Sequence, residues 1–263
     1  MSFNNPAIII ISGAFSTPKS YGKLASALES HGYEVHVPRL PTNSEARPPT
    51  AGLAEDTAFI RSHVEGLVTA GHKVVAISHS YGGQVMSNAL CGLGLDTRST
   101  QGLQGGVSAL IYMAAFALTK GQSTFAKLSE FGAGGNDAHL VFDIAEDQSL
   151  VLKDPKAFLG LGEPGIEESE IEAYVQCSSR WNAKPTTQPL EEEAWREIPS
   201  AYIHTTKDEA VPLVVQHSMV EALEKAGRKV QTFTLDTAHC PHFTATDSVV
   251  DAINSIVASD GPV

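Results

Sequence analysis

The pentapeptide SHSYG at residues 78–82 constrains the fold of this chain more than any other segment. It lies between an apolar, strand-like run at residues 73–77 and a helix-like stretch at residues 83–93. On a sharp strand-to-helix turn, a central serine presents its hydroxyl at the edge of a sheet, and the next backbone N–H points at a bound carbonyl oxygen. Only small residues fit two positions before and two positions after that serine, and here they are Ser78 and Gly82. We therefore predict that Ser80 is a nucleophile and that the N–H of Tyr81 binds an oxyanion.

Strand-like and helix-like segments alternate along most of the chain. The expected strands are residues 7–11, 34–37, 73–77, 107–115, 201–205 and 230–235. The expected helices are residues 18–31, 54–68, 83–93, 213–226 and 248–257. Continuous β-branched runs are typical of strands buried on both faces. This order predicts an α/β fold with a mostly parallel central sheet and helices on both of its faces.

Residues 118–199 interrupt the alternation. They are mostly helix-like and contain no clear β-rich run. We expect them to form a helical lid over the site, with a merely stabilising helical subdomain as the alternative. The chain then divides into a first part of the core at 1–117, the insertion at 118–199 and a second part of the core at 200–263. The polar, glycine-rich residues 92–106 are expected to form a mobile surface loop.

Charge and cysteine content exclude several classes of function. The 263 residues include 18 Lys and Arg against 30 Asp and Glu, a formal net charge of -12. Such a chain is repelled by phosphate backbones and anionic lipid surfaces, so neither nucleic acid nor a membrane is an expected partner. Three widely spaced cysteines predict neither a disulfide framework nor a zinc site. The first apolar run is too short for a signal peptide, which favours a cytoplasmic protein. The oligomeric state is left open, a homodimer included.

A serine hydroxyl needs a base to accept its proton, and an acid to orient that base. On this kind of fold the chain order is serine, then Asp or Glu, then histidine. His239 follows the expected strand at 230–235 by a short loop, which makes it the predicted base. His242 is the main rival. His79 lies inside the turn and is expected to be a packed or solvated imidazole.

The acid is expected at the carboxyl edge of a strand, where catalytic groups of parallel sheets gather. Asp208 follows the expected strand at 201–205 and is the predicted acid. Its neighbour Glu209 and the later Asp236 are the two alternatives. Asp236 is nearer to the predicted base in sequence, but it directly follows the strand at 230–235 and is not expected to reach the imidazole.

A second oxyanion donor is expected in the loop after the first strand. That loop contains Ser12, Gly13, Ala14 and Phe15. Glycine allows a close turn at this point. We predict that the backbone N–H of Ala14 acts together with that of Tyr81, with the N–H of Phe15 as the alternative to Ala14.

Together, residues 12–15, 78–83, 206–208 and 238–241 resemble the α/β-hydrolase superfamily. The likeness is greatest to its compact branch of plant methyl-ester esterases, hydroxynitrile lyases and many fungal and bacterial serine hydrolases. It covers nearly the whole chain and is weakest at residues 118–180. It implies an α/β-hydrolase fold and a triad of Ser80, His239 and Asp208, with no metal or organic cofactor.

Three departures from that branch bear on the chemistry. Ser12 stands where the branch usually has histidine, and the first residue of the turn is serine where glycine is common. Hydroxynitrile lyases carry a lysine beside the catalytic histidine, whereas Cys240 and Pro241 stand there in this chain, which counts against cyanohydrin cleavage. A serine rather than an aspartate at position 80 counts against epoxide hydrolases and dehalogenases.

The predicted function is hydrolysis of an ester, lactone or thioester of an apolar small molecule. The same triad could instead serve a non-hydrolytic reaction such as cyclisation, condensation or C–C bond cleavage. A small-molecule receptor with little turnover is the third hypothesis. The expected insertion, together with Phe116 just before it, offers these apolar side chains as candidate pocket walls: Phe116, Phe125, Leu128, Phe131, Phe142, Phe158 and Trp181.

Overall fold

The computed structural model describes residues 5–132 and 138–259. Its main sheet has six strands in the order β2-β1-β3-β4-β8-β9, and every pairing between them is parallel. The strands are β1 (Ala7–Ile11), β2 (Glu34–His36), β3 (Lys73–His79), β4 (Gly106–Met113), β8 (Ser200–Thr205) and β9 (Val230–Leu235). The predicted fold class and all six predicted strands are confirmed.

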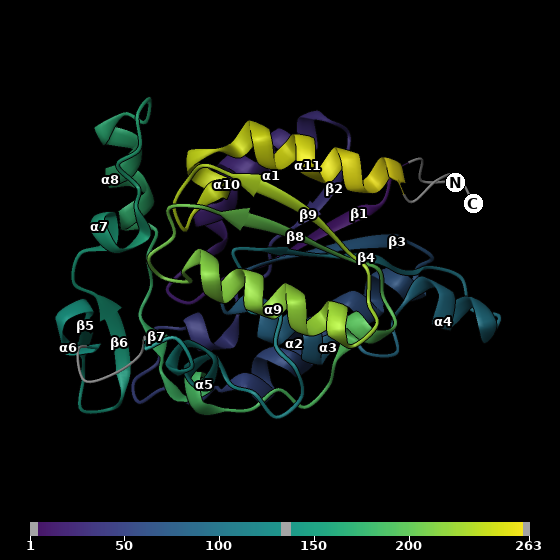
Figure 1. Ribbon diagram of the computed structural model, residues 1–263, viewed down its shortest axis with the longest axis horizontal. Coiled ribbons are helices and arrows are strands. Elements are labelled where there is room, and N and C mark those ends of the chain that lie inside the picture. Colours follow the sequence, from purple (N-terminus) through teal and green to yellow (C-terminus); the bar gives the residue numbers. More distant parts are fainter. Residues whose placement is uncertain (1–4, 133–137, 260–263) are drawn as a thin grey trace.

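Helices cover both faces of this sheet (Figure 1). On one face lie α1 (Gly22–Ser30) and α11 (Thr246–Ser259), and on the other lie α2 (Leu53–Thr69), α3 (Gly82–Ala89) and α9 (Leu213–Lys225). Successive side chains of a strand point to opposite faces. Ile8 and Ile10 therefore pack against the first pair of helices, and Ile9 and Ile11 pack on the second face.

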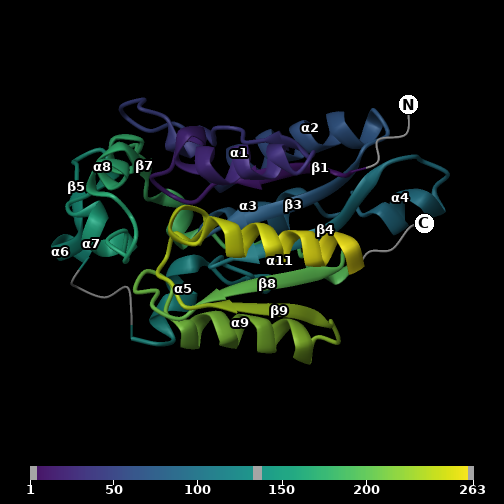
Figure 2. The same cartoon turned by 90° about the horizontal axis from the view of Figure 1, so that it is seen from above.

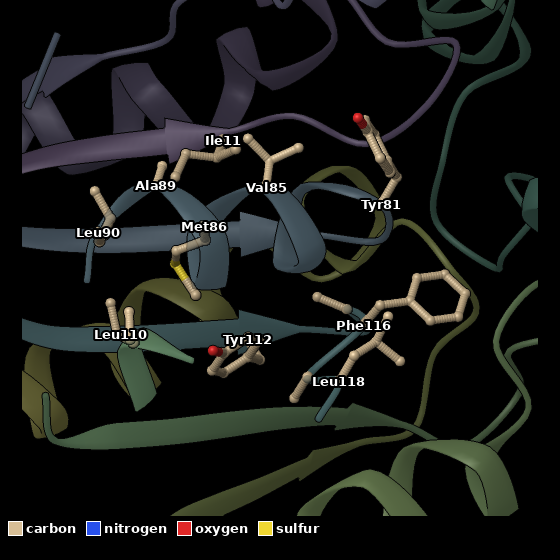
Figure 3. Close-up of a cluster of buried hydrophobic side chains, with 14 of the residues drawn as sticks. Ile11, Tyr81, Val85, Met86, Ala89, Leu90, Leu110, Tyr112, Phe116 and Leu118 are labelled. Atoms are coloured by element: carbon tan, nitrogen blue, oxygen red, sulfur yellow. The ribbon is translucent and has the colours of Figure 1, made fainter. Parts of the chain in front are cut away.

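The helix that follows Ser80 is buried along its whole length. It packs on the face of the sheet formed by β1 and β3, and its Val85 and Met86 belong to the same apolar cluster as Ile11 and Leu110 (Figure 3). Every residue of α3 is less than a tenth exposed. The turn that carries the serine is thus anchored to the centre of the core.

The insertion, residues 118–199, lies between β4 and β8. It contains α5 (Thr124–Ser129), α6 (Ala138–Val141), α7 (Pro155–Leu159) and α8 (Glu168–Gln176), and a three-stranded antiparallel sheet of β5 (Phe142–Ile144), β6 (Ser149–Leu152) and β7 (Trp181–Asn182). The expectation that this mostly helix-like segment contains no strands is therefore wrong. Strands of two to four residues are too short to show the period-two pattern that identifies a strand in a sequence.

The prediction of a mobile loop at residues 92–106 is also wrong. The segment contains α4 (Leu95–Thr100), and the Arg98 guanidinium donates hydrogen bonds to the carbonyl oxygens of Gly105, Gln104 and Val68. One arginine thus ties the helix to the start of β4 and to the end of α2. The short helices not yet mentioned are η1 (Pro18–Tyr21), η2 (Pro41–Asn43), η3 (Lys184–Thr187), η4 (Ala194–Arg196) and α10 (Pro241–Thr244).

In the insertion, α6, α7, α8 and the small sheet lie at the end of the molecule toward which the strands of the main sheet point (Figures 1 and 2). This is the carboxyl edge of the sheet, where Ser80, Asp208 and His239 follow their strands. Among the described residues, no helix combines the length and apolarity needed to cross a bilayer.

Candidate active site

The backbone at Ser80 has a φ of +52°, in the left-handed region that non-glycine residues rarely adopt. Such strain persists only where the surroundings hold it, and here both neighbouring strands do. The Ser80 carbonyl accepts hydrogen bonds from the N–H groups of Gly83 and Phe116, at 3.1 and 3.0 Å. A Cβ atom at Gly82 would lie 2.7 Å from the carbonyl oxygen of Ser12, so the close approach of this turn to β1 requires glycine.

His239 and Asp208 are in direct contact. The imidazole Nδ1 lies 2.8 Å from the carboxylate Oδ2, and both side chains are buried. A carboxylate only accepts hydrogen bonds, so Nδ1 of His239 carries the proton. The opposite nitrogen, Nε2, is then an acceptor, the state that a general base requires.

The Asp208 carboxylate is held in its charged form. Burial by itself would raise its pKa, but the charge of His239 and several hydrogen bonds outweigh burial and lower it. The donors are the backbone N–H groups of Ala210 and Val211, the Thr205 hydroxyl and the Gln216 amide. A carboxylate fixed by this many donors keeps both its charge and its orientation.

The rival residues lie elsewhere. Glu209 is exposed, and Asp236 is an exposed partner of Lys207, at 2.9 Å. His242 is fully buried, and its Nε2 lies 2.9 Å from the Tyr174 hydroxyl. His79 is buried as well, with hydrogen bonds at both ring nitrogens. None of these four rivals replaces Asp208 or His239 at the contact just described.

The loop after β1 packs directly on the turn that carries Ser80. A Cβ atom at Gly13 would lie 3.0 Å from Cβ of Ser80, so a larger residue at position 13 would push against the turn. Within the described part of the chain, the backbone N–H groups of Ala14, Phe15 and Tyr81 donate to no protein acceptor. All three residues line the same cavity as Ser80. These N–H groups are therefore free to bind an oxyanion, and Phe15 stays beside Ala14 as a candidate.

Sequence reasoning missed a buried carboxylate next to Tyr81. Asp56 of α2 is fully buried and accepts hydrogen bonds from the hydroxyls of Tyr81 and Thr42, at 2.8 and 2.5 Å. Burial raises its pKa to about 6, although these hydrogen bonds lower it. Trp181 of the insertion donates to Thr42 in turn, at 3.2 Å. The only signal in the sequence was a polar residue on the apolar face of a helix.

Ser80 and His239 open onto one apolar cavity of about 130 Å³. Five of the seven predicted wall residues line it, whereas Phe125 and Phe131 are exposed and do not. Phe15 has a φ of +62° and stacks on Phe142, with ring centroids 5.7 Å apart. The further walls come from both the core and the insertion and include Phe116, Leu128, Phe158, Leu159, Trp181 and Val211.

The insertion also holds the loop that carries His239. Glu163 Oε1 accepts hydrogen bonds from the N–H of Ala238 and the hydroxyl of Thr237, at 2.6 and 2.7 Å. On the other side of the histidine, the Tyr174 hydroxyl of α8 lies 3.4 Å from Cys240 Sγ. Burial raises the pKa of that thiol to about 12, so it is neutral and is not a competing nucleophile.

One enzyme fold is expected to combine a strained serine on a strand-to-helix turn with a buried Asp–His pair and with free N–H groups at the same cavity. Comparison with known families agrees, because residues 8–252 match the alpha/beta hydrolase family. The chain belongs to this family. In this alpha/beta hydrolase the residue directly after His239 is the buried Cys240 and not a lysine.

Relatives of this alpha/beta hydrolase match it nearly end to end. A probable hydrolase from a Phoma species is 26% identical over 250 residues, which are 94% of this chain and 96% of the relative. An alpha/beta hydrolase from Aspergillus novofumigatus is 29% identical over 250 residues, with 95% and 96% covered. A pyrethroid hydrolase from Sphingobium wenxiniae is 26% identical over 255 residues, with 94% and 85% covered.

Solved structures share the fold at lower identity. A pyrethroid hydrolase from Sphingobium faniae superposes with a TM-score of 0.73 at 21% identity, with 97% of this chain and 98% of that chain covered. A methylesterase from Arabidopsis has a TM-score of 0.70 at 18% identity, with 96% and 99% covered. These structures share the fold of this alpha/beta hydrolase, and its relatives by sequence carry the names of hydrolases.

Proposed function

We propose that this protein hydrolyses a carboxylic ester, lactone or thioester of an apolar small molecule, with Ser80, His239 and Asp208 as its catalytic triad. The observation that carries the proposal is the buried 2.8 Å contact between Asp208 and His239 in the loop that borders the cavity of Ser80. It sets the tautomer in which His239 Nε2 can accept the serine proton.

In the proposed reaction, the Ser80 hydroxyl attacks the carbonyl carbon and passes its proton to His239 Nε2. The N–H groups of Ala14 and Tyr81 bind the oxyanion of the tetrahedral intermediate. When the intermediate collapses, the bond to the leaving group breaks, and His239 returns the proton to the departing alkoxide or thiolate. Water then attacks the acyl-enzyme, again with His239 as the base, which releases the acid and regenerates Ser80.

The cavity favours an uncharged substrate of modest size. Its walls are largely aromatic and aliphatic, and among the residues that the structure describes no lysine, arginine, aspartate or glutamate lines it. A charged acyl group would lose its hydration there without a partner, at a cost of several kcal/mol. The insertion covers this cavity in the manner of a lid, since Leu128, Phe142 and Trp181 contribute to its walls.

The proposal is tested with p-nitrophenyl butyrate turnover and a fluorophosphonate probe, followed by peptide mass mapping. Ser80→Ala should lose both label and turnover, the latter by at least about four orders of magnitude. Ser78→Ala, two residues away in the same turn, is the matched control and should keep both. Turnover by Ser80→Ala at the wild-type rate would overturn the proposal. Labelled Ser80 without turnover of any ester in a broad panel would favour the non-hydrolytic alternative.

A further inference from the structure

A buried chain of hydrogen bonds joins the three loops of the candidate site. The backbone N–H of Gly13 lies 2.9 Å from the Tyr21 hydroxyl, which lies 2.9 Å from His79 Nδ1. His79 Nε2 lies 2.8 Å from the carbonyl oxygen of His239. Tyr21 is fully buried, and His79 and His239 are 2% and 3% exposed, so no water competes for these bonds.

The donor and the acceptor of each hydrogen bond in this series follow from the groups at its two ends, the N–H of Gly13 and the carbonyl of His239. A carbonyl oxygen only accepts, so His79 Nε2 carries the proton and donates to His239. In a neutral imidazole Nδ1 is then an acceptor, and it takes the Tyr21 proton. The Tyr21 oxygen accepts the N–H of Gly13. Burial, followed by the nearby charge of His239, lowers the pKa of His79 to about 3, which agrees with a neutral ring.

The same residues contact two parts of the proposed reaction centre. One is the loop at residues 12–15, called the oxyanion loop, and the other is the loop that carries His239, called the base loop. Gly13 precedes the oxyanion donor Ala14, and its own carbonyl accepts a hydrogen bond from the Asn43 amide at 3.0 Å. His79 precedes the nucleophile Ser80, and its ring stands 4.7 Å from that of His239, centroid to centroid. The histidine inside the turn therefore contacts the oxyanion loop through Tyr21 and the base loop directly.

We propose that His79 is a positioning residue, which holds the backbone of His239 on one side and, through Tyr21, the oxyanion loop on the other. This inference rests on the proposed function, because it concerns the same reaction. It assigns a role to a side chain that lies outside the proposed triad. It also explains how the loop that begins with Ser12 is braced, since Tyr21 and Asn43 hold both polar groups of Gly13.

Two substitutions separate the two hydrogen bonds of His79, one to Tyr21 and one to His239. Glutamine places an amide N–H near the position of Nε2 and can keep the bond to His239. Asparagine places an acceptor near Nδ1 and can keep the bond to Tyr21, but it is too short to reach the carbonyl of His239. We expect His79→Asn to lower kcat by about 10- to 100-fold with KM within about threefold, because a small displacement of the base slows the chemistry rather than binding. His79→Gln should recover most of that loss.

Tyr21→Phe tests the hydrogen bonds on the Tyr21 side of His79. It removes the acceptor of the Gly13 N–H and the donor to His79 while leaving the aromatic ring in the core. We expect a slower reaction of Ser80 with the fluorophosphonate probe, by about 10-fold or more. This variant keeps the inference testable if His79→Asn does not fold, as judged by circular dichroism.

The outcomes distinguish this inference from the proposed function. If Ser80→Ala abolishes turnover but folded His79→Asn and Tyr21→Phe keep wild-type kcat and labelling rates, His79 is only a core residue and the inference is wrong. An equal loss in His79→Asn and His79→Gln, with KM raised as much as kcat is lowered, would also overturn it. If Ser80→Ala turns over p-nitrophenyl butyrate as well as the wild type, the proposed function fails and the inference fails with it.

Discussion

His239 Nδ1 and Asp208 Oδ2 lie 2.8 Å apart, and neither side chain is more than 4% exposed. A charge-assisted hydrogen bond this short and this well shielded from water holds the imidazole in one orientation. The carboxylate also keeps its charge, because His239 and the surrounding donors lower its pKa against the effect of burial. The pair is therefore arranged to stabilise an imidazolium when one forms.

Replacing Asp208 by asparagine should lower kcat for p-nitrophenyl butyrate by about three to four orders of magnitude. The amide can donate to Nδ1, which favours the tautomer in which His239 Nε2 carries a proton and cannot act as a base. Steady-state kinetics measure the effect. The matched controls are Glu209→Gln and Asp236→Asn, which should stay within about twofold of the wild type. A large loss in either control with little loss in Asp208→Asn would contradict our choice of the acid.

Gly82→Ala should strongly destabilise the protein, by roughly 3 kcal/mol or more, because the new Cβ atom would overlap backbone atoms of β1 that cannot move aside. Urea unfolding followed by circular dichroism measures the change. Gly66→Ala is the control. A Cβ atom there, inside α2, meets nothing within 4 Å, so this change should stabilise the protein by about 0.5–1 kcal/mol. Equal effects of the two substitutions would argue against the described turn.

Glu163→Ala should lower kcat by about tenfold, because the loop that carries His239 loses its acceptor for the N–H of Ala238 and the hydroxyl of Thr237. Glu163→Gln keeps a carbonyl oxygen at that position and should retain most of the activity. The exposed Glu167 serves as the control, and Glu167→Ala should behave as the wild type. If all three variants have the same kcat, the insertion does not position the base through Glu163.

Asp56 should make stability depend on pH in a specific direction. Burial raises the pKa of this carboxyl from 3.8 to about 6, so the folded protein binds a proton that the unfolded chain has already lost in that range. Stability therefore falls as pH rises from about 4 to 6.5, by roughly 3 kcal/mol, and Asp56→Asn should lack this component. Urea midpoints of both proteins across the range give the difference, in which titrations common to both cancel. A difference that does not change with pH would contradict the raised pKa.

The sequence by itself determined the architecture and the chain order of the chemical groups. Continuous apolar strands alternating with one-sided helices leave few ways to bury their surfaces, and a parallel sheet between helices is the one observed. The turn at Ser80 was predictable because Ser78 and Gly82, two positions before and after it, are small as such a turn requires. Asp208 and His239 were predictable because the carboxyl ends of parallel strands meet at one edge.

Only the tertiary structure decided what surrounds those groups. Asp56, Glu163 and Tyr21 reach the site from α2, from the insertion and from η1, over sequence separations that no local pattern records. The small sheet of the insertion was hidden for a different reason, since strands of two to four residues carry too little periodicity to be read. Hydrogen bonds between distant segments form only once the core has packed, and it is these contacts that orient the serine turn, the oxyanion loop and the base toward one another.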